Sequence, residues 1–187
     1  EKLARYPASL SALTVAIGDL CALTAAERDA LVAAIRRTNL VVYACDIHAA
    51  EPDGLRALGR QLGLARLDRN FLADDDGMSR VTVAGDKARG EFIPYTNRPI
   101  GWHTDGYYNP PGRRIRAMLL HCVRQAAAGG ENTLLDHEIA YLRLRDEDPV
   151  HVRALMLPDA LTIPAREDED GIARPAETGP VFSVEPE

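Results

Sequence analysis

The order of helical and β-type segments most constrains how this chain can fold. The clearest local signal is a capping box, in which Thr24 is followed three residues later by Glu27, ahead of an apolar stripe with helical spacing. Helices are expected at 24–37, 52–62, 137–145 and 149–157. Strands are expected at 40–44, 80–83, 116–123, 133–135, 161–163 and 181–184, with an acidic loop at 166–171. Helices that lead and strands that dominate the middle and end predict an α+β fold.

Length and composition indicate one ordinary globular domain. The chain has 187 residues, of which 46% are hydrophobic and 27% charged. A net charge of −6 without a basic block argues against a nucleic-acid surface. The sequence has no run of 18 apolar residues, so it does not predict a membrane span. Its three cysteines are widely spaced, which suggests neither a disulfide framework nor a zinc ribbon. We therefore expect a cytoplasmic protein. Because the chain begins at Glu1 rather than Met and stops at Glu187 without an evident end signal, we also expect a fragment.

The most informative short segment contains His103 and Asp105, separated by one residue. In an extended segment these two side chains point to the same face. An imidazole beside a carboxylate is typical of the facial triad of non-haem Fe(II) oxygenases, whose three protein ligands leave positions open for a co-substrate and dioxygen. The same pattern also fits a loop histidine that is hydrogen-bonded to a neighbouring carboxylate. Both interpretations stay open from this triplet alone.

Three motifs in order carry a family resemblance. They are Trp-His-Thr-Asp at 102–105 with Pro-Pro at 110–111, Met-Leu-Leu-His-Cys at 118–122, and Gly-Gly-Glu-Asn-Thr at 129–133. Together they resemble the TauD/TfdA family of Fe(II)- and 2-oxoglutarate-dependent dioxygenases, and within it most closely the γ-butyrobetaine hydroxylase-like branch. The resemblance is strong from about 95 to 135 and only general before that.

The resemblance implies a double-stranded β-helix, or jelly roll, flanked by N-terminal helices and incomplete at the C-terminus. It implies a single domain over 1–187, with helices over about 1–70 and the β-helix core from about 78 onward. By the family pattern, His103 and Asp105 are catalytic residues and the first two Fe(II) ligands, and 2-oxoglutarate is the co-substrate. The third ligand, a distal histidine, and the arginine that pairs with 2-oxoglutarate fall in a part of the pattern that this chain does not reach.

Cofactor and substrate contacts are expected on both sides of the metal pair. The resemblance places a hydroxyl-bearing residue after the glycine pair, where this chain has Asn132 and then Thr133. An amide or a hydroxyl can donate to a carboxylate, so Asn132 is favoured over Thr133, although both could merely shape the turn. Candidate substrate-contacting residues are Tyr95, Asn97, Tyr107 and Tyr108. Trp102 is expected in the core, with a place in the lining of the substrate pocket as the alternative. His121, His137 and His151 are expected to lie outside the triad.

The leading functional hypothesis is a dioxygenase that hydroxylates a small organic substrate and releases succinate and CO2. One alternative is a cupin-like protein in which the same pair holds a different metal. Another is a pseudoenzyme or binding domain of the same fold. The expected partners are a small-molecule substrate and dioxygen, without nucleic acid or membrane, and homo-oligomer formation stays open.

Overall fold

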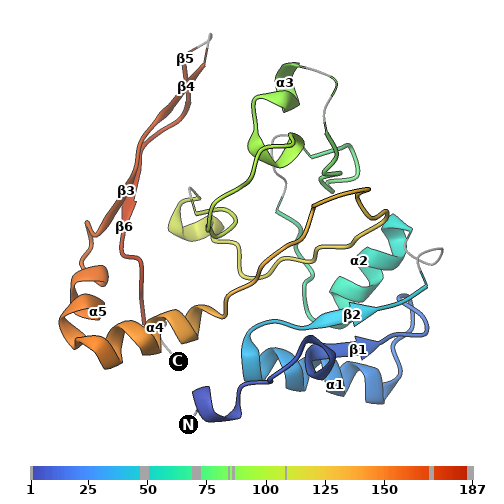
Figure 1. Cartoon of the computed structure of the whole chain (residues 1–187). Coiled ribbons are helices and arrows are strands. Elements are labelled where there is room, and N and C mark those ends of the chain that lie inside the picture. The colour runs from blue at the N-terminus through green and yellow to red at the C-terminus, as the bar shows by residue number, and fades with distance from the viewer. Residues whose placement is uncertain are drawn as a thin grey trace.

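The N-terminal third of the chain forms a β-α-β unit. The computed structural model describes residues 2–46, 51–68, 73–83, 85, 87–107, 109–168 and 171–184. After two 3-10 turns, η1 (Leu3–Arg5) and η2 (Leu10–Leu13), strand β1 (Thr14–Ala16) pairs in parallel with β2 (Val42–Ala44), and helix α1 (Ala25–Thr38) connects them (Figure 1). The expected helix at 24–37 and strand at 40–44 are therefore confirmed to within two residues.

Helix α1 begins and ends where its capping residues place it. The Thr24 hydroxyl accepts from the Glu27 amide at 3.2 Å, and the Glu27 carboxylate accepts from the Thr24 amide at 2.7 Å. This reciprocal pair is the expected capping box. At the other end Asn39 has a φ of 57°, a left-handed conformation that asparagine tolerates and that stops the helix.

The hydrophobic core lies within the β-α-β unit and between this unit and α2 (Pro52–Gln61). Its fully enclosed members are Ile17, Leu20, Leu31 and Leu58. The Gln61 side chain joins the end of α2 to the segment that precedes α1. It accepts a hydrogen bond from the Leu23 amide at 2.8 Å and donates one to the Leu20 carbonyl at 2.9 Å. Leu119 also packs against this core, although it is far away in the sequence. The segment around 119 is thereby docked on the N-terminal unit.

The C-terminal part consists of two helices and a narrow ribbon. Helices α4 (His137–Glu147) and α5 (Pro149–Leu155) match the expected segments. In the ribbon, β3 (Leu161–Ile163) pairs with β6 (Glu177–Gly179), and β4 (Arg166–Asp168) pairs with β5 (Gly171–Arg174) farther from the helices, with both pairs antiparallel (Figure 1). The prediction of a loop at 166–171 was wrong for 166–168 and 171, which pair in β4 and β5, while 169–170 lie outside the described residues. The strand expected at 181–184 was also wrong, since 177–179 is the partner of β3.

The middle of the chain has little regular structure. It contains the short helix α3 (Lys87–Gly90) and the 3-10 turns η4 (Ile93–Tyr95) and η5 (Pro111–Arg113). The strands expected at 80–83, 116–123 and 133–135 do not form, because the described residues give them no hydrogen-bonded partner strand. Within the described ranges the sheets are three separate pairs, and they do not close into a barrel.

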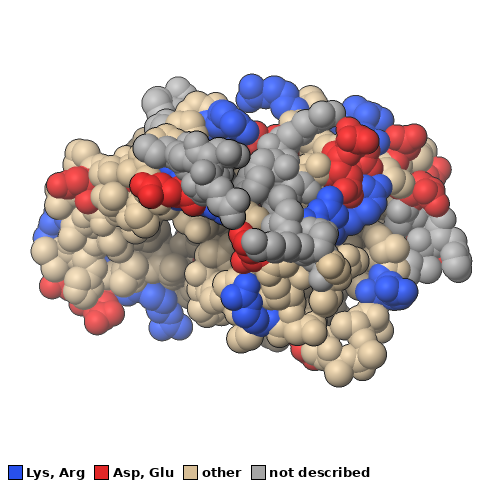
Figure 2. Space-filling model, turned by 90° about the horizontal axis from the view of Figure 1, so that it is seen from above, with Lys and Arg blue, Asp and Glu red and all other residues tan. Residues whose placement is uncertain are grey.

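Ion pairs organise the acidic turn that precedes this region. Arg80 binds Asp74 at 2.7 Å and Asp76 at 2.8 Å, and Arg89 binds the other oxygen of Asp74 at 2.7 Å. The hydrogen bond from Arg80 is the main reason that the pKa of Asp76 falls to about 2. On the face shown in Figure 2, acidic and basic side chains are interspersed rather than separated by sign. No helix in the described part of the chain is long and apolar enough to cross a bilayer.

Candidate metal centre

His103 and Asp105 lie close together on an irregular loop. The Nε2 atom of His103 is 3.9 Å from Oδ1 of Asp105. The two side chains are 38% and 49% exposed, so solvent reaches both. Residues 101–104 pair with no strand and 105–107 form a turn, so this segment is not a β-strand. The loop nevertheless brings the imidazole and the carboxylate to the same place.

The ring of His103 is held in one tautomer by its own backbone. Its Nδ1 lies 2.8 Å from the Gly101 carbonyl oxygen, which can only accept a hydrogen bond. Nδ1 therefore carries a proton, and in the neutral ring Nε2, on the side of Asp105, presents a lone pair. A metal-bound histidine typically donates its second ring N–H to a carbonyl or carboxylate in this way.

Asp105 is positioned by a tight turn that requires glycine. Gly106 has a φ of 65°, and its carbonyl accepts from the Asn109 amide at 2.8 Å. A Cβ on Gly106 would overlap the side chain of Ile115. The Asn109 side chain donates to the Arg113 carbonyl at 3.0 Å, which closes the loop onto itself. The conformation of the residue next to Asp105 is thus fixed by packing and by backbone hydrogen bonds.

The donor set of this pair fits a divalent iron ion. A neutral imidazole nitrogen and a carboxylate oxygen are two of the three ligands of the facial triad. Bonds of about 2.1 Å at right angles put two such ligand atoms about 3 Å apart. The observed 3.9 Å therefore has to close by about 1 Å, which rotation of these two exposed side chains permits. The described residues contain no group of three or more His, Cys, Asp or Glu side chains that could hold a metal.

The candidate 2-oxoglutarate contacts lie on a separate glycine turn. Gly129 and Gly130 have φ values of 69° and 81°, conformations that favour glycine at both positions. Asn132 and Thr133 follow on an exposed segment. The Asn132 amide makes a long hydrogen bond of 3.4 Å to the Gly130 carbonyl. The turn is therefore formed as expected, while the roles of Asn132 and Thr133 stay predictions.

Comparison with known proteins decides the family. Residues 2–187 match the family described as taurine catabolism dioxygenase TauD, TfdA family. The chain belongs to the TauD/TfdA family. It is 40% identical over 84 residues to a uridine-5'-phosphate dioxygenase from Amycolatopsis sp, covering 45% of this chain and 29% of that protein. It is 36% identical over 113 residues to one from Streptomyces sp, covering 58% and 38%. The matches thus span about a third of those relatives' length. No solved structure matches the chain significantly.

The aromatic residues of this TauD/TfdA chain divide between the interior and the surface. Tyr95 is only 5% exposed, and the Arg89 guanidinium lies 5.8 Å from its ring centre. Tyr107 and Asn97 are exposed, and Tyr108 lies outside the described residues. Trp102 is 71% exposed, so the prediction that it belongs to the core was wrong. Trp102 follows Gly101 in an irregular loop, so its side chain is not directed toward the core by the alternation of a strand.

Sequence analysis missed a partnership between Tyr43 on β2 and His121. The Tyr43 hydroxyl is 2.9 Å from Nδ1 of His121, and the two rings stack with centres 5.7 Å apart. Burial lowers the pKa of His121 and raises that of Tyr43 to about 12, so both are neutral near pH 7. The other ring nitrogen, Nε2, is buried without a partner among the described residues. Local sequence gives no signal for a contact between residues 78 positions apart.

Proposed function

We propose that this chain forms the part of an Fe(II)- and 2-oxoglutarate-dependent dioxygenase that supplies two of the iron ligands. The enzyme hydroxylates a small organic substrate and converts 2-oxoglutarate to succinate and CO2. The observation that carries the proposal is the His103–Asp105 pair, in which the Gly101 carbonyl fixes the imidazole so that Nε2 is free to bind. Membership of the TauD/TfdA family supports the same reaction class.

Each residue has a defined task in this proposal. His103 binds through Nε2 and Asp105 through a carboxylate oxygen, while Gly106 keeps Asp105 beside the histidine. The iron supplies dioxygen activation and an electrophilic site for the co-substrate. Asn132 donates a hydrogen bond to a 2-oxoglutarate carboxylate, with Thr133 as the alternative donor. A third protein ligand completes the triad, and the proposal assigns it to none of the described residues.

We further propose that the protein is cytoplasmic and forms one domain over 1–187, with a jelly-roll core that begins at about residue 78. The relatives named uridine-5'-phosphate dioxygenase make uridine 5'-phosphate the first substrate to test. The proposed substrate contacts are Tyr107 and Asn97, which are both exposed, together with Tyr108 and the buried Tyr95.

Succinate formation by the intact protein tests the function. With Fe(II), 2-oxoglutarate and uridine 5'-phosphate, we expect succinate to form, and His103→Ala to abolish both iron binding and succinate. His151→Ala is the matched control, because His151 is an exposed histidine on α5, outside the candidate centre. Succinate release by His103→Ala at the wild-type rate would contradict the role of this residue. Binding of Zn(II) or Mn(II) without any response to 2-oxoglutarate would instead favour the cupin-like alternative.

A further inference from the structure

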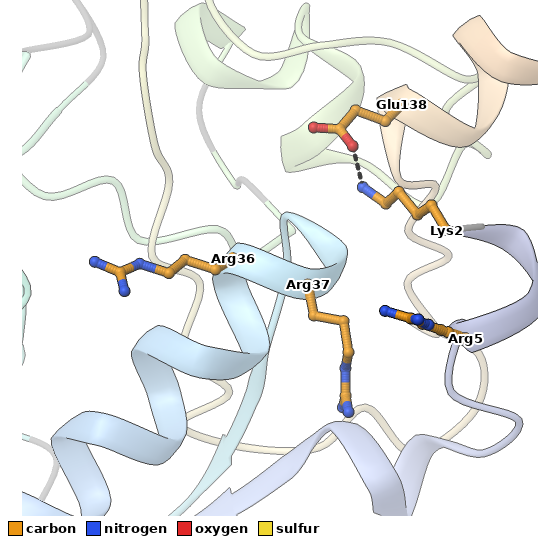
Figure 3. Close-up of a pocket in the computed structure, with 5 residues that line it drawn as sticks. All are labelled: Lys2, Arg5, Arg36, Arg37 and Glu138. Atoms are coloured by element: carbon orange, nitrogen blue, oxygen red, sulfur yellow. Dashed lines mark hydrogen bonds and ion pairs between the residues drawn. The ribbon is translucent and has the colours of Figure 1, made fainter.

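Asp136 and Asp68 each connect parts of the chain that lie far apart in the sequence. Asp136 pairs with Lys2 at 2.8 Å, and Lys2 also binds Glu138 beside the cavity shown in Figure 3. That network joins the N-terminal turn to the start of α4. Asp68 instead contacts the loop that carries the candidate metal centre. The proposed dioxygenase reaction gives Asp68 no task, so its contacts need a separate explanation.

The two carboxylate oxygens of Asp68 bind two residues of the same loop. Oδ1 accepts from the Arg113 guanidinium at 2.8 Å, and Oδ2 accepts a long hydrogen bond of 3.4 Å from the Asn109 side-chain amide. The same amide nitrogen, which carries two protons, also donates to the Arg113 carbonyl at 3.0 Å. Because Arg113 lies four residues after Asn109, the carboxylate of Asp68 holds both ends of this stretch.

The stretch held by Asp68 encloses Gly106, the residue that follows Asp105. A Cβ built on Gly106 would lie 2.3 Å from Cγ1 of Ile115 and 3.0 Å from the side-chain nitrogen of Asn109. The Asn109 backbone amide also donates to the Gly106 carbonyl at 2.8 Å. A displacement of Asn109 therefore moves Gly106, and Asp105 moves with it.

On its other side, Asp68 is connected to the packed N-terminal part of the fold. It lies in the segment that follows α2, and Leu58 of this helix is a fully buried member of the hydrophobic core. Just after α2, the Leu64 amide donates to the Gly59 carbonyl at 2.9 Å, which ties the start of the segment 64–68 to the helix. Asp68 thus links a well-packed element to a loop without regular structure.

An ordinary surface ion pair is the alternative explanation. The side chains of Arg113 and Asp68 are 59% and 34% exposed. Pairs with this exposure contribute little to global stability, because water competes for both charges. Such a pair does not require a second contact from the same carboxylate to Asn109, which borders Gly106. The arrangement fits a local role, in which Asp68 sets the position of the loop.

We propose that Asp68 is a positioning residue for the candidate metal centre. It holds Asn109, which in turn holds Gly106. Asp105 thereby stays beside His103. The inference rests on the proposed function, because Asp68 has this task only if the His103–Asp105 pair binds a metal. Residues that orient metal ligands from behind change metal affinity by about 10- to 100-fold when they are removed.

Anaerobic titration of the intact protein with Fe(II), and separately with Co(II), tests the role of Asp68. Asp68→Ala is expected to weaken the binding of both metals about tenfold. It is also expected to shift the visible absorption of bound Co(II), which reports ligand geometry. Asp146→Ala is the matched control, because Asp146 forms a partly exposed pair with Arg145 at 2.7 Å, on α4. Urea unfolding should change little in either variant, which separates metal affinity from folding.

Hydrogen exchange of the metal-free protein gives a readout that does not depend on the metal. The Asn109 amide is expected to exchange faster in Asp68→Ala and at the wild-type rate in Asp146→Ala. Asp68→Glu keeps the carboxylate, so it is expected to restore most of the metal affinity and of the protection. Asn109→Ala keeps the charge of Asp68 but removes the side chain through which it acts. Its metal affinity is expected to fall as far as that of Asp68→Ala.

The possible failures of this inference and of the proposed function are distinguishable. Unchanged metal affinity in Asp68→Ala would overturn the inference and leave the proposed function intact. A loss in Asp68→Ala with full affinity in Asn109→Ala would show that the charge of Asp68 acts on the metal directly, which contradicts a positioning role. A wild-type protein that binds neither metal would overturn the proposed function, and the inference with it.

Discussion

The Asn39 side-chain amide donates a 2.9 Å hydrogen bond to the carboxylate of Asp136, 97 residues further along the chain. Asn39 ends α1, and Asp136 is the N-cap of α4, where its carboxylate also accepts from the Glu138 amide at 2.9 Å. Lys2 approaches the other carboxylate oxygen at 2.8 Å, and the Asp136 side chain is fully buried. One carboxylate therefore joins the N-terminus, the end of α1 and the start of α4, and it sets the position of Glu138.

Asp136→Ala is expected to destabilise the protein by about 2–4 kcal/mol, because it removes a cap and leaves Lys2 and Asn39 without their buried acceptor. Asp148→Ala is the matched control, since Asp148 caps α5 through the Val150 amide but is exposed. Its expected cost is about 1 kcal/mol, the usual value of an N-cap. Urea unfolding of the two variants measures the difference. Equal losses would show that the Asn39 and Lys2 contacts contribute nothing beyond capping.

Partly buried His121 is expected to make folding sensitive to mild acid. Burial lowers its pKa below the ordinary 6.5, so the unfolded chain binds a proton more readily than the folded one. The stability contributed by the neutral ring is complete above pH 6.5 and is lost as the pH falls through the lowered pKa. His121→Gln should flatten the pH dependence between pH 7 and 5, as measured by urea unfolding. A profile in this variant as steep as that of the wild type would assign the acid sensitivity to other groups.

Tyr43→Phe separates the hydrogen bond from the packing of the same pair. Removing the hydroxyl leaves Nδ1 of His121 without its 2.9 Å partner but keeps the stacked rings. We expect a loss of about 1 kcal/mol at pH 7, the typical net value of such a bond. Tyr141→Phe is the control, because the Tyr141 ring packs edge-on against Phe182 outside this contact. Differential unfolding with denaturant compares the two, and identical losses would mean that the Tyr43 hydroxyl has no special role.

Local sequence signals predicted helices α1, α2, α4 and α5 but not the short α3, and long-range contacts decided the rest. Thr24 and Glu27 form their capping box from four consecutive residues, so the sequence contains everything that this helix start requires. The segment 116–123 has an equally clear β pattern, but a strand needs a partner, and its residues instead meet the N-terminal unit through Leu119 and His121. Likewise, the spacing of His103 and Asp105 suggested their proximity, but the Gly106 turn that produces it depends on Ile115.

Gly106→Ala is expected to disturb the candidate metal centre by two effects, the strain of a positive φ and a clash of the new Cβ with Ile115. Gly63 also has a positive φ, at 84°, but a Cβ there would meet nothing within 4 Å. Gly63→Ala therefore measures conformational strain alone, about 1 kcal/mol. Gly106→Ala adds a clash with Ile115, worth about 1–3 kcal/mol more, and shifts Asp105. We expect Fe(II) affinity to fall at least tenfold in Gly106→Ala and to stay unchanged in Gly63→Ala. Equal iron affinity in both would remove the turn from the site.

Asn132 and Thr133 compete for the same proposed task, and two single variants decide between them. Both residues are exposed just after the Gly129–Gly130 turn, so neither substitution is expected to cost more than about 0.5 kcal/mol in stability. If the Asn132 amide donates to a carboxylate of 2-oxoglutarate, Asn132→Ala should raise the KM for 2-oxoglutarate roughly tenfold, equivalent to about 1.4 kcal/mol for a hydrogen bond to a charged group. Maximal turnover should change less, because the contact is the same before and during the reaction.

Thr133→Ala should leave the KM for 2-oxoglutarate unchanged. The reverse result would move the role to Thr133, and an unchanged KM in both variants would mean that the two residues only shape the turn.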